Sequence, residues 1–108
     1  DLKPGMKAYD EEVFGPVVCI WKVKDIEEAI KIANDTPYGL GASIYTEDVP
    51  NAEKIARRIE SGMVYVNKQV SSSPDLPFGG VKHSGYGREL SKAGIMEFIN
   101  KKLIMIAK

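Results

Sequence analysis

The sequence predicts an α/β fold built on a parallel sheet. Three short apolar segments, at residues 17–23, 40–45 and 63–66, alternate with two segments whose apolar residues recur at helical spacing. Short links join these segments, and the order strand, helix, strand, helix, strand is typical of right-handed βαβ units. A chain of 108 residues is long enough for one modest core. We therefore expect a βαβαβ unit, followed by a loop, a helix and a last strand.

The first strand and the first helix are expected in the first third of the chain. Residues 17–23 read Val-Val-Cys-Ile-Trp-Lys-Val, and such a nearly continuous apolar run is typical of a strand covered on both faces. Asp25 stands where a helix N-cap would, with Glu28 three residues later as in a capping box. One apolar stripe follows, made of Ile26, Ala29, Ile30 and Ala33. The Thr-Pro-Tyr-Gly sequence at residues 36–39 ends this helix.

The second helix is expected between the second and third strands. Residues 40–45 form the second strand, and the small Gly41 allows close packing there. Asp48 is a suitable cap for the helix, and Pro50 falls in its first turn, where proline is tolerated. The apolar stripe of this helix is Ala52, Ile55, Ala56 and Ile59. Gly62 ends the helix before the third strand begins.

The pattern changes after the third strand. Residues 67–91 combine glycines, prolines and isolated aromatics, and so long a loop in a compact domain is usually functional or disordered. The aromatic residues favour function, because disordered linkers contain few of them. A short helix is then expected over residues 91–99. Residues 103–107, Leu-Ile-Met-Ile-Ala, form an apolar terminal strand that needs a partner.

The composition argues against several classes of protein. The 15 Lys and Arg balance the 15 Asp and Glu, so no basic surplus favours nucleic acid. No apolar run reaches the about 20 residues of a membrane span, and the N-terminal residues lack the layout of a signal peptide. A single cysteine forms no internal disulfide, which fits a cytoplasmic protein. The first residue is not Met, as expected either of a piece of a longer polypeptide or of a processed chain.

Cys19 and His83 are one candidate pair of nucleophile and base. Cys19, however, lies in the middle of an expected strand between two apolar residues, so a buried inert thiol is strongly favoured. His83 has no second ligand near it in the sequence, so we expect no metal site.

Two other segments contain residue types suited to binding. Residues 11–17 read Glu-Glu-Val-Phe-Gly-Pro-Val. They form either an acidic turn with its Phe in the core, or a site where a carboxylate binds a diol such as a ribose and the ring packs a flat group. Residues 77–89 read Pro-Phe-Gly-Gly-Val-Lys-His-Ser-Gly-Tyr-Gly-Arg-Glu. Their Gly-x-Gly is not a dinucleotide fingerprint, because Leu90 replaces the third glycine and no strand runs directly into it.

Together, these two segments resemble two signatures of the aldehyde dehydrogenase family. They occur in the family's order and at the right separation, so the resemblance covers essentially the whole chain. It implies that the chain is the C-terminal portion of an NAD(P)-dependent aldehyde dehydrogenase. Residues 1–100 would then belong to the catalytic domain, and residues 101–108 would form an oligomerisation strand. The implied partners are an aldehyde, the N-terminal part of the enzyme and further copies in a homo-oligomer.

The resemblance also implies roles for individual residues. Glu12 would hold the nicotinamide ribose of NAD or NADP, and Phe14 would pack near the nicotinamide. Phe78 would line the aldehyde tunnel beside the reacting carbon. Glu89 would have a supporting catalytic role as an acidic residue behind the general base. Its neighbour Arg88 would be structural.

Residues 66–78 and 84–91 resemble the succinate-semialdehyde dehydrogenase branch of the family in particular. In that branch a serine six residues before the tunnel Phe binds the distal carboxylate of the substrate, which places this role on Ser72. A hydroxyl donor suits a carboxylate acceptor. The arginines that complete the clamp lie upstream in this branch, so other semialdehydes and hydroxyaldehydes remain open as substrates.

The resemblance implies a covalent reaction that this chain does not complete. In the family, a cysteine thiolate attacks the aldehyde to form a thiohemiacetal, hydride passes to NAD(P)+, and an activated water releases the acid. The nucleophile, the general-base Glu, the oxyanion-holding Asn and the dinucleotide-binding domain are absent, and Cys19 does not match the nucleophile's position. We therefore expect an enzyme fragment that is inactive alone.

The alternative is a stand-alone structural or assembly module that uses the terminal strand. An isolated nicotinamide-nucleotide binder ranks third, because the adenosine pocket is missing.

Overall fold

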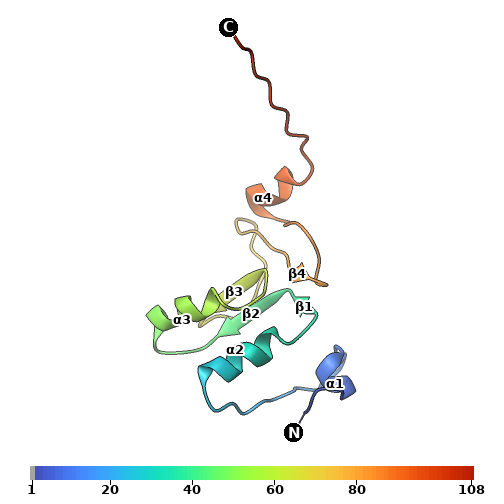
Figure 1. Ribbon diagram of the computed structural model, residues 1–108, viewed down its shortest axis with the longest axis vertical. Helices are drawn as coiled ribbons and strands as arrows, with labels where there is room; N and C mark the ends of the chain where they lie inside the picture. Colours follow the sequence, from blue (N-terminus) through green and yellow to red (C-terminus); the bar gives the residue numbers. More distant parts are fainter. Residues whose placement is uncertain (1) are drawn as a thin grey trace. The chain divides into compact units, whose positions relative to one another are not determined.

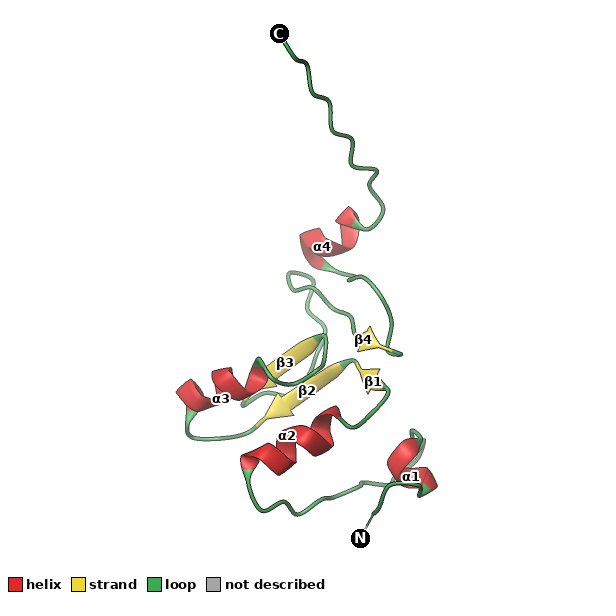
Figure 2. Ribbon diagram, viewed as in Figure 1, coloured by secondary structure: helices red, strands yellow, loops and turns green. Residues whose placement is uncertain are grey.

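A computed structural model of the chain describes residues 2–108 (Figures 1 and 2). The chain divides into two compact units, one ending at Thr36 and the other spanning Pro37–Lys108. The first unit contains α1 (Lys7–Asp10) and α2 (Ile26–Asn34). The second unit contains β1 (Tyr38–Gly39), β2 (Gly41–Ile44), α3 (Val49–Ala56), β3 (Met63–Val66), β4 (Val81–Lys82) and α4 (Ser91–Met96). None of the described helices is long and apolar enough to cross a membrane.

Helix α2 begins and ends where its sequence indicated. The Asp25 carboxylate accepts a hydrogen bond of 2.9 Å from the backbone N–H of Glu28, which satisfies one of the free amides of the first turn. The Glu28 carboxylate reaches back and accepts a 2.8 Å hydrogen bond from the N–H of Lys24, one residue before the cap. The predicted capping pair is therefore confirmed, and its returning hydrogen bond is shifted by one residue. Ile30 is the buried residue of this helix.

Residues 17–23 form no strand, so the prediction of a first strand here was wrong. A strand exists only as part of a hydrogen-bonded ladder, and none of the described strands pairs with this segment. Its side chains nevertheless alternate, because Cys19, Trp21 and Val23 are half-buried while the residues between them are exposed. One face of the segment is covered by the chain, not the two that the continuous apolar run indicated.

The second unit contains one parallel βαβ unit. β2 pairs with β3 in parallel, in a register that runs from Gly41 opposite Met63 to Ile44 opposite Val66. Helix α3 connects the two strands and packs against β3 (Figure 2). The second and third strands and the helix between them are thereby confirmed. Ala52 is fully buried and Met63 is 8% exposed, so a small core lies between α3 and the strands.

Helix α3 also confirms its predicted start but ends earlier than expected. The Asp48 carboxylate accepts a hydrogen bond of 3.2 Å from the backbone N–H of Asn51, and Pro50 stands in the first turn. After Ala56 the chain tightens, because the N–H of Arg58 bonds to the carbonyl of Ile55, only three residues back. The regular helix therefore stops well before Gly62.

A second, antiparallel pair of strands was not predicted. Tyr38 lies opposite Lys82 and Gly39 lies opposite Val81, so β1 and β4 form their own two-stranded sheet. Each strand is two residues long, too short for a visible alternation of apolar and polar residues. The fold is thus a mixed α/β arrangement of two small sheets, not the single parallel sheet that was expected.

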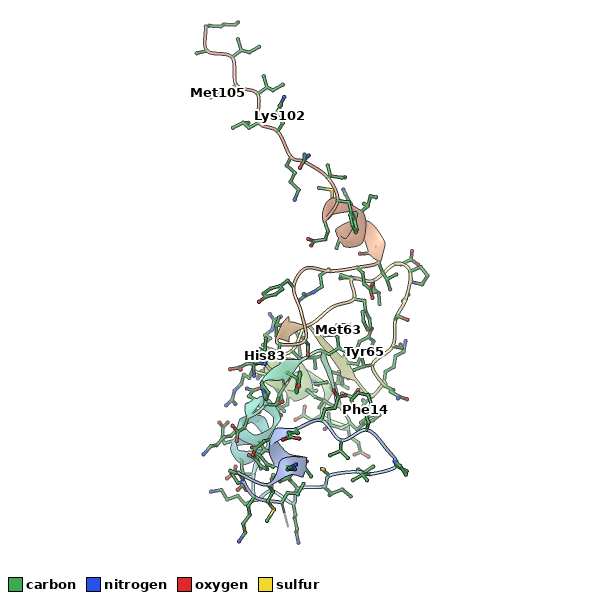
Figure 3. All side chains as sticks on the ribbon, turned by 90° about the vertical axis from the view of Figure 1, so that its right-hand side faces the viewer. Phe14, Met63, Tyr65, His83, Lys102 and Met105 are labelled. Atoms are coloured by element: carbon green, nitrogen blue, oxygen red, sulfur yellow. The ribbon has the colours of Figure 1, made fainter. Side chains whose placement is uncertain are left out.

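The end of the chain differs from expectation as well. Helix α4 stops at Met96, three residues before the expected end, and residues 103–107 form no strand. The side chains from Leu103 to Ile106 are between 75% and 89% exposed. Figure 3 shows Lys102 and Met105 on this segment, with no other element beside them. The single chain has no strand at this segment, because no described strand offers the backbone partner that a strand requires, and the oligomerisation strand stays a prediction.

Candidate functional site

The loop between β3 and α4 is closed by a direct backbone contact between Phe78 and Glu89. The N–H of Phe78 donates to the carbonyl of Glu89 at 2.9 Å, and the N–H of Glu89 donates to the carbonyl of Phe78 at 2.8 Å. This exchange is an isolated antiparallel bridge. Two residues predicted to be functional, eleven positions apart in the sequence, are therefore held side by side.

Arg88 fixes the stretch of loop between these two residues. Its guanidinium donates hydrogen bonds to the carbonyl of Gly80 at 2.9 Å and to the carbonyl of Gly87 at 2.6 Å. The backbone N–H of Arg88 donates to a carboxylate oxygen of Glu97 in the turn after α4, at 3.3 Å. These bonds show a structural role, because the side chain satisfies backbone carbonyls that the loop leaves unpaired.

The same loop is also attached to β1. The backbone N–H of Gly39 donates to the hydroxyl of Ser84 at 2.9 Å, and the N–H of His83 donates to the carbonyl of Pro37 at 2.9 Å. The ammonium of Lys82 lies 2.7 Å from the carboxylate of Glu60. Backbone, hydroxyl and ionic contacts therefore all restrain the segment that presents Phe78 and Glu89.

A cavity of about 390 Å³ lies beside this bridge. Its lining includes Phe78, Arg88 and Glu89 from the loop, together with Glu97 and Phe98 from the turn after α4. Phe78 is half-buried and Glu89 is exposed. The cavity thus places an aromatic wall next to carboxylates, an arrangement that can hold a small molecule with an apolar part and a polar end.

Ser72 lies outside the lining of this cavity. It is exposed on the loop that follows β3, one residue after Ser71, whose carbonyl accepts a 2.8 Å hydrogen bond from the Tyr65 hydroxyl. That bond restrains the backbone next to the exposed Ser72.

Glu12 and Phe14 belong to the first unit and are both exposed. The Phe14 ring is 90% exposed, so the alternative in which this ring belongs to a core is wrong for the chain described here. An exposed aromatic face and an exposed carboxylate two residues apart fit the nicotinamide riboside part of a dinucleotide, which offers a flat ring and a diol.

Cys19 has a structural contact. Its thiol is half-buried and donates to the carbonyl of Ala8 at 3.5 Å. Across residues 2–108, no three His, Cys, Asp or Glu side chains are grouped as metal ligands would be.

No sequence pattern indicated a polar pair in the first unit. The Tyr9 hydroxyl donates a hydrogen bond to the carboxylate of Asp35, 26 residues away. This bond raises the pKa of Tyr9 above its ordinary value, because it favours the neutral phenol; slight desolvation and the negative charges of Asp35 and Asp10 act in the same direction. No local spacing links the two residues, so only the folded chain reveals the pair.

Comparisons with known proteins identify relatives of this chain. Residues 1–104 match the profile of the aldehyde dehydrogenase family. The chain is 50% identical, over 96% of its length, to a succinate-semialdehyde dehydrogenase [NADP(+)] of Deinococcus radiodurans, of which it covers 22%. It is 49% identical to a probable succinate-semialdehyde dehydrogenase [NADP(+)] of Synechocystis, over 99% of the chain and 24% of that protein.

A solved structure shows the same similarity. The succinic semialdehyde dehydrogenase of Streptococcus pyogenes, in complex with NADP+, superposes with a TM-score of 0.93 at 48% identity, over 99% of this chain and 24% of that one. The chain therefore spans about a quarter of the length of the relatives it matches.

Proposed function

This chain belongs to the aldehyde dehydrogenase family, and we propose that it is the C-terminal part of an NAD(P)-dependent enzyme that oxidises succinate semialdehyde to the acid. The observation that carries the proposal is the bridge between Phe78 and Glu89 beside a cavity. It occurs in a chain that resembles succinate-semialdehyde dehydrogenases along nearly its whole length.

The cofactor contacts are proposed for the first unit. When bound, NAD or NADP supplies the acceptor for the hydride that leaves the aldehyde. The carboxylate of Glu12 accepts hydrogen bonds from the ribose hydroxyls, and the ring of Phe14 packs near the nicotinamide. Their exposure supports this assignment, since neither group has to be released from a core before it binds.

The substrate contacts are proposed for the second unit. Phe78 forms an apolar wall beside the reacting carbon, and the Ser72 hydroxyl donates a hydrogen bond to the distal carboxylate of the substrate. Glu89 stands behind the general base of the complete enzyme and positions it for proton transfer. The bridge to Phe78 supports this arrangement, because it keeps the wall and the acidic residue at a fixed separation.

The remaining proposals concern the chain's partners. The rest of the enzyme supplies the nucleophilic cysteine and the dinucleotide-binding domain, so the 108-residue chain is inactive alone. Residues 1–100 belong to the catalytic domain, and residues 101–108 become a strand when they pair within a cytoplasmic homo-oligomer. The exposed apolar side chains from Leu103 to Ile106 support this pairing. They equally support the alternative of a stand-alone assembly module.

The decisive experiment compares this chain with a full-length protein that contains it. NAD(P)H formation is followed with succinate semialdehyde and with butanal, which has the same carbon chain without the carboxylate. We expect turnover by the full-length protein, a clear preference for succinate semialdehyde and no turnover by the 108-residue chain. Turnover by the chain alone would contradict the proposed division of roles, and equal use of both aldehydes would contradict the substrate. Micromolar NAD(P)+ binding by the chain in calorimetry would instead favour a nucleotide binder.

A further inference from the structure

The first unit contains a pocket of about 430 Å³ that none of the proposed site residues lines. One wall is a single face of α2, because Ala29, Ile32 and Ala33 follow one another at helical spacing. The facing wall is formed by Tyr9 of α1 and Trp21, whose rings meet edge to face with centroids 6.0 Å apart. All the lining residues belong to the first unit, so this unit forms the pocket by itself.

The pocket has an acidic edge. Asp35 follows the last residue of α2 and lines the pocket, and its carboxylate accepts one side-chain hydrogen bond, from the Tyr9 hydroxyl. No cationic side chain among the described residues forms an ion pair with it. A carboxylate can accept about four hydrogen bonds, so Asp35 retains acceptor capacity towards a ligand.

The aromatic rings of the pocket, like the Asp35 carboxylate, attract positive charge. The faces of tyrosine and tryptophan rings carry partial negative charge and attract cations, as a carboxylate does. The indole N–H of Trp21 is buried and has no hydrogen-bond acceptor among the described residues, so this wall contains an unsatisfied donor. Apolar walls, electron-rich rings and one carboxylate together suit a ligand with an apolar body and a positively charged end.

We propose that this pocket binds a small organic ammonium ion, with its apolar body between Trp21 and the Ala29–Ile32 face and its ammonium group at the Asp35 carboxylate. The site is independent of the five residues assigned to cofactor and substrate. Its volume falls within the range of small-molecule sites, about 300–1,000 Å³. Because the two sets of residues do not overlap, a failure of the chain to bind ammonium would leave the proposed dehydrogenase function untouched.

Trp21 gives a direct test, because it is the one tryptophan of the chain and it lines the pocket. Its fluorescence is titrated in the full 108-residue chain at neutral pH with phenethylammonium and with phenethyl alcohol, which has the same shape without the charge. We expect a saturable change with the ammonium and binding about tenfold weaker, or more, with the alcohol. No saturable change with either probe would overturn the proposal, and so would equal affinity for both.

Three variants of pocket-lining residues and one control variant test the proposed contacts. Asp35→Asn should lower the ammonium affinity about tenfold or more and leave the alcohol unaffected, whereas Asp75→Asn in the second unit should change neither. Ala29→Leu should weaken both probes because it fills the pocket. Tyr9→Phe keeps the ring and frees the carboxylate, so ammonium binding should be retained or strengthened. Loss of ammonium binding in Tyr9→Phe with helicity intact, or its persistence in Asp35→Asn, would contradict the proposed contacts.

Discussion

Phe78 and Glu89 exchange two backbone hydrogen bonds of 2.9 and 2.8 Å, so the backbone positions that present the aromatic ring and the carboxylate are held side by side. The bridge turns eleven residues of glycine-rich loop into a closed structure with a fixed base. A loop of this composition would otherwise lose much conformational entropy on ordering. The contacts of Arg88, Ser84 and Lys82 offset that loss.

Replacing Arg88 should destabilise the chain. In Arg88→Met the carbonyls of Gly80 and Gly87 lose their charged donor, and the expected cost is about 1–3 kcal/mol in the free energy of unfolding. Urea denaturation measures the change. The matched control is Arg57→Met, because the Arg57–Glu53 pair is exposed and should contribute less than about 0.5 kcal/mol. Equal effects of the two substitutions would show that the Arg88 contacts are dispensable.

A methyl group at Gly62 should be poorly tolerated. A Cβ there would overlap the carbonyl oxygen of Gly79, and a backbone atom cannot move aside as a flexible side chain can. We expect Gly62→Ala to lower the free energy of unfolding by about 1–3 kcal/mol or more. At Gly41 the nearest atom is a Val70 side-chain methyl at 3.0 Å, so Gly41→Ala should cost clearly less in the same denaturation experiment. The reverse order would contradict this packing.

Ser72 should determine the preference for a carboxylate substrate. In the full-length enzyme, Ser72→Ala should lower kcat/KM for succinate semialdehyde roughly 10-fold to 100-fold, because a hydrogen bond to a charged group is lost. The kcat/KM for butanal should stay within about twofold, since butanal lacks the carboxylate. Ser71→Ala is the control, because the contact of Ser71 with Tyr65 uses its backbone carbonyl and survives the substitution. A parallel loss for both aldehydes in Ser72→Ala would point to a structural role.

Tyr9 should ionise at a higher pH than an ordinary tyrosine. Its raised pKa results mainly from the hydrogen bond to Asp35, so Asp35→Asn should lower that pKa, and Tyr9→Phe identifies the Tyr9 step in the ultraviolet titration by removing it. The folded-state pKa lies above the unfolded value of about 10. The stabilisation is therefore fully present below pH 10 and is lost as the pH rises through the folded-state pKa. A pKa of Tyr9 that Asp35→Asn leaves unchanged would contradict the contact.

The C-terminal segment should mediate association. Because the side chains from Leu103 to Ile106 are exposed and apolar, the chain should sediment as more than a monomer at high protein concentration. Ile104→Lys together with Ile106→Lys should shift it towards the monomer, whereas Lys101→Ala should have little effect. A monomer at every concentration would refute both the oligomerisation strand and the assembly module.

The sequence by itself determined the elements whose signals are local. Asp25 and Asp48 each have a side chain that caps the backbone three residues ahead, and both helices begin where these residues indicate. The apolar segments at β2 and β3 are joined by a short helix, which favours a parallel pair, and the structure has that pair. The two motifs indicated the family, because a sequence signature does not depend on the fold being known.

Tertiary structure alone decided which segments pair. Residues 17–23 and 103–107 have strand-like sequences, but a strand needs a second backbone, and none of the described strands supplies it. β1 and β4 have almost no strand signal, yet they pair because the loop returns to Pro37 and Gly39. The Phe78–Glu89 bridge and the Tyr9–Asp35 contact have the same origin. Such contacts join residues far apart in the chain, and hydrophobic periodicity contains no information about them.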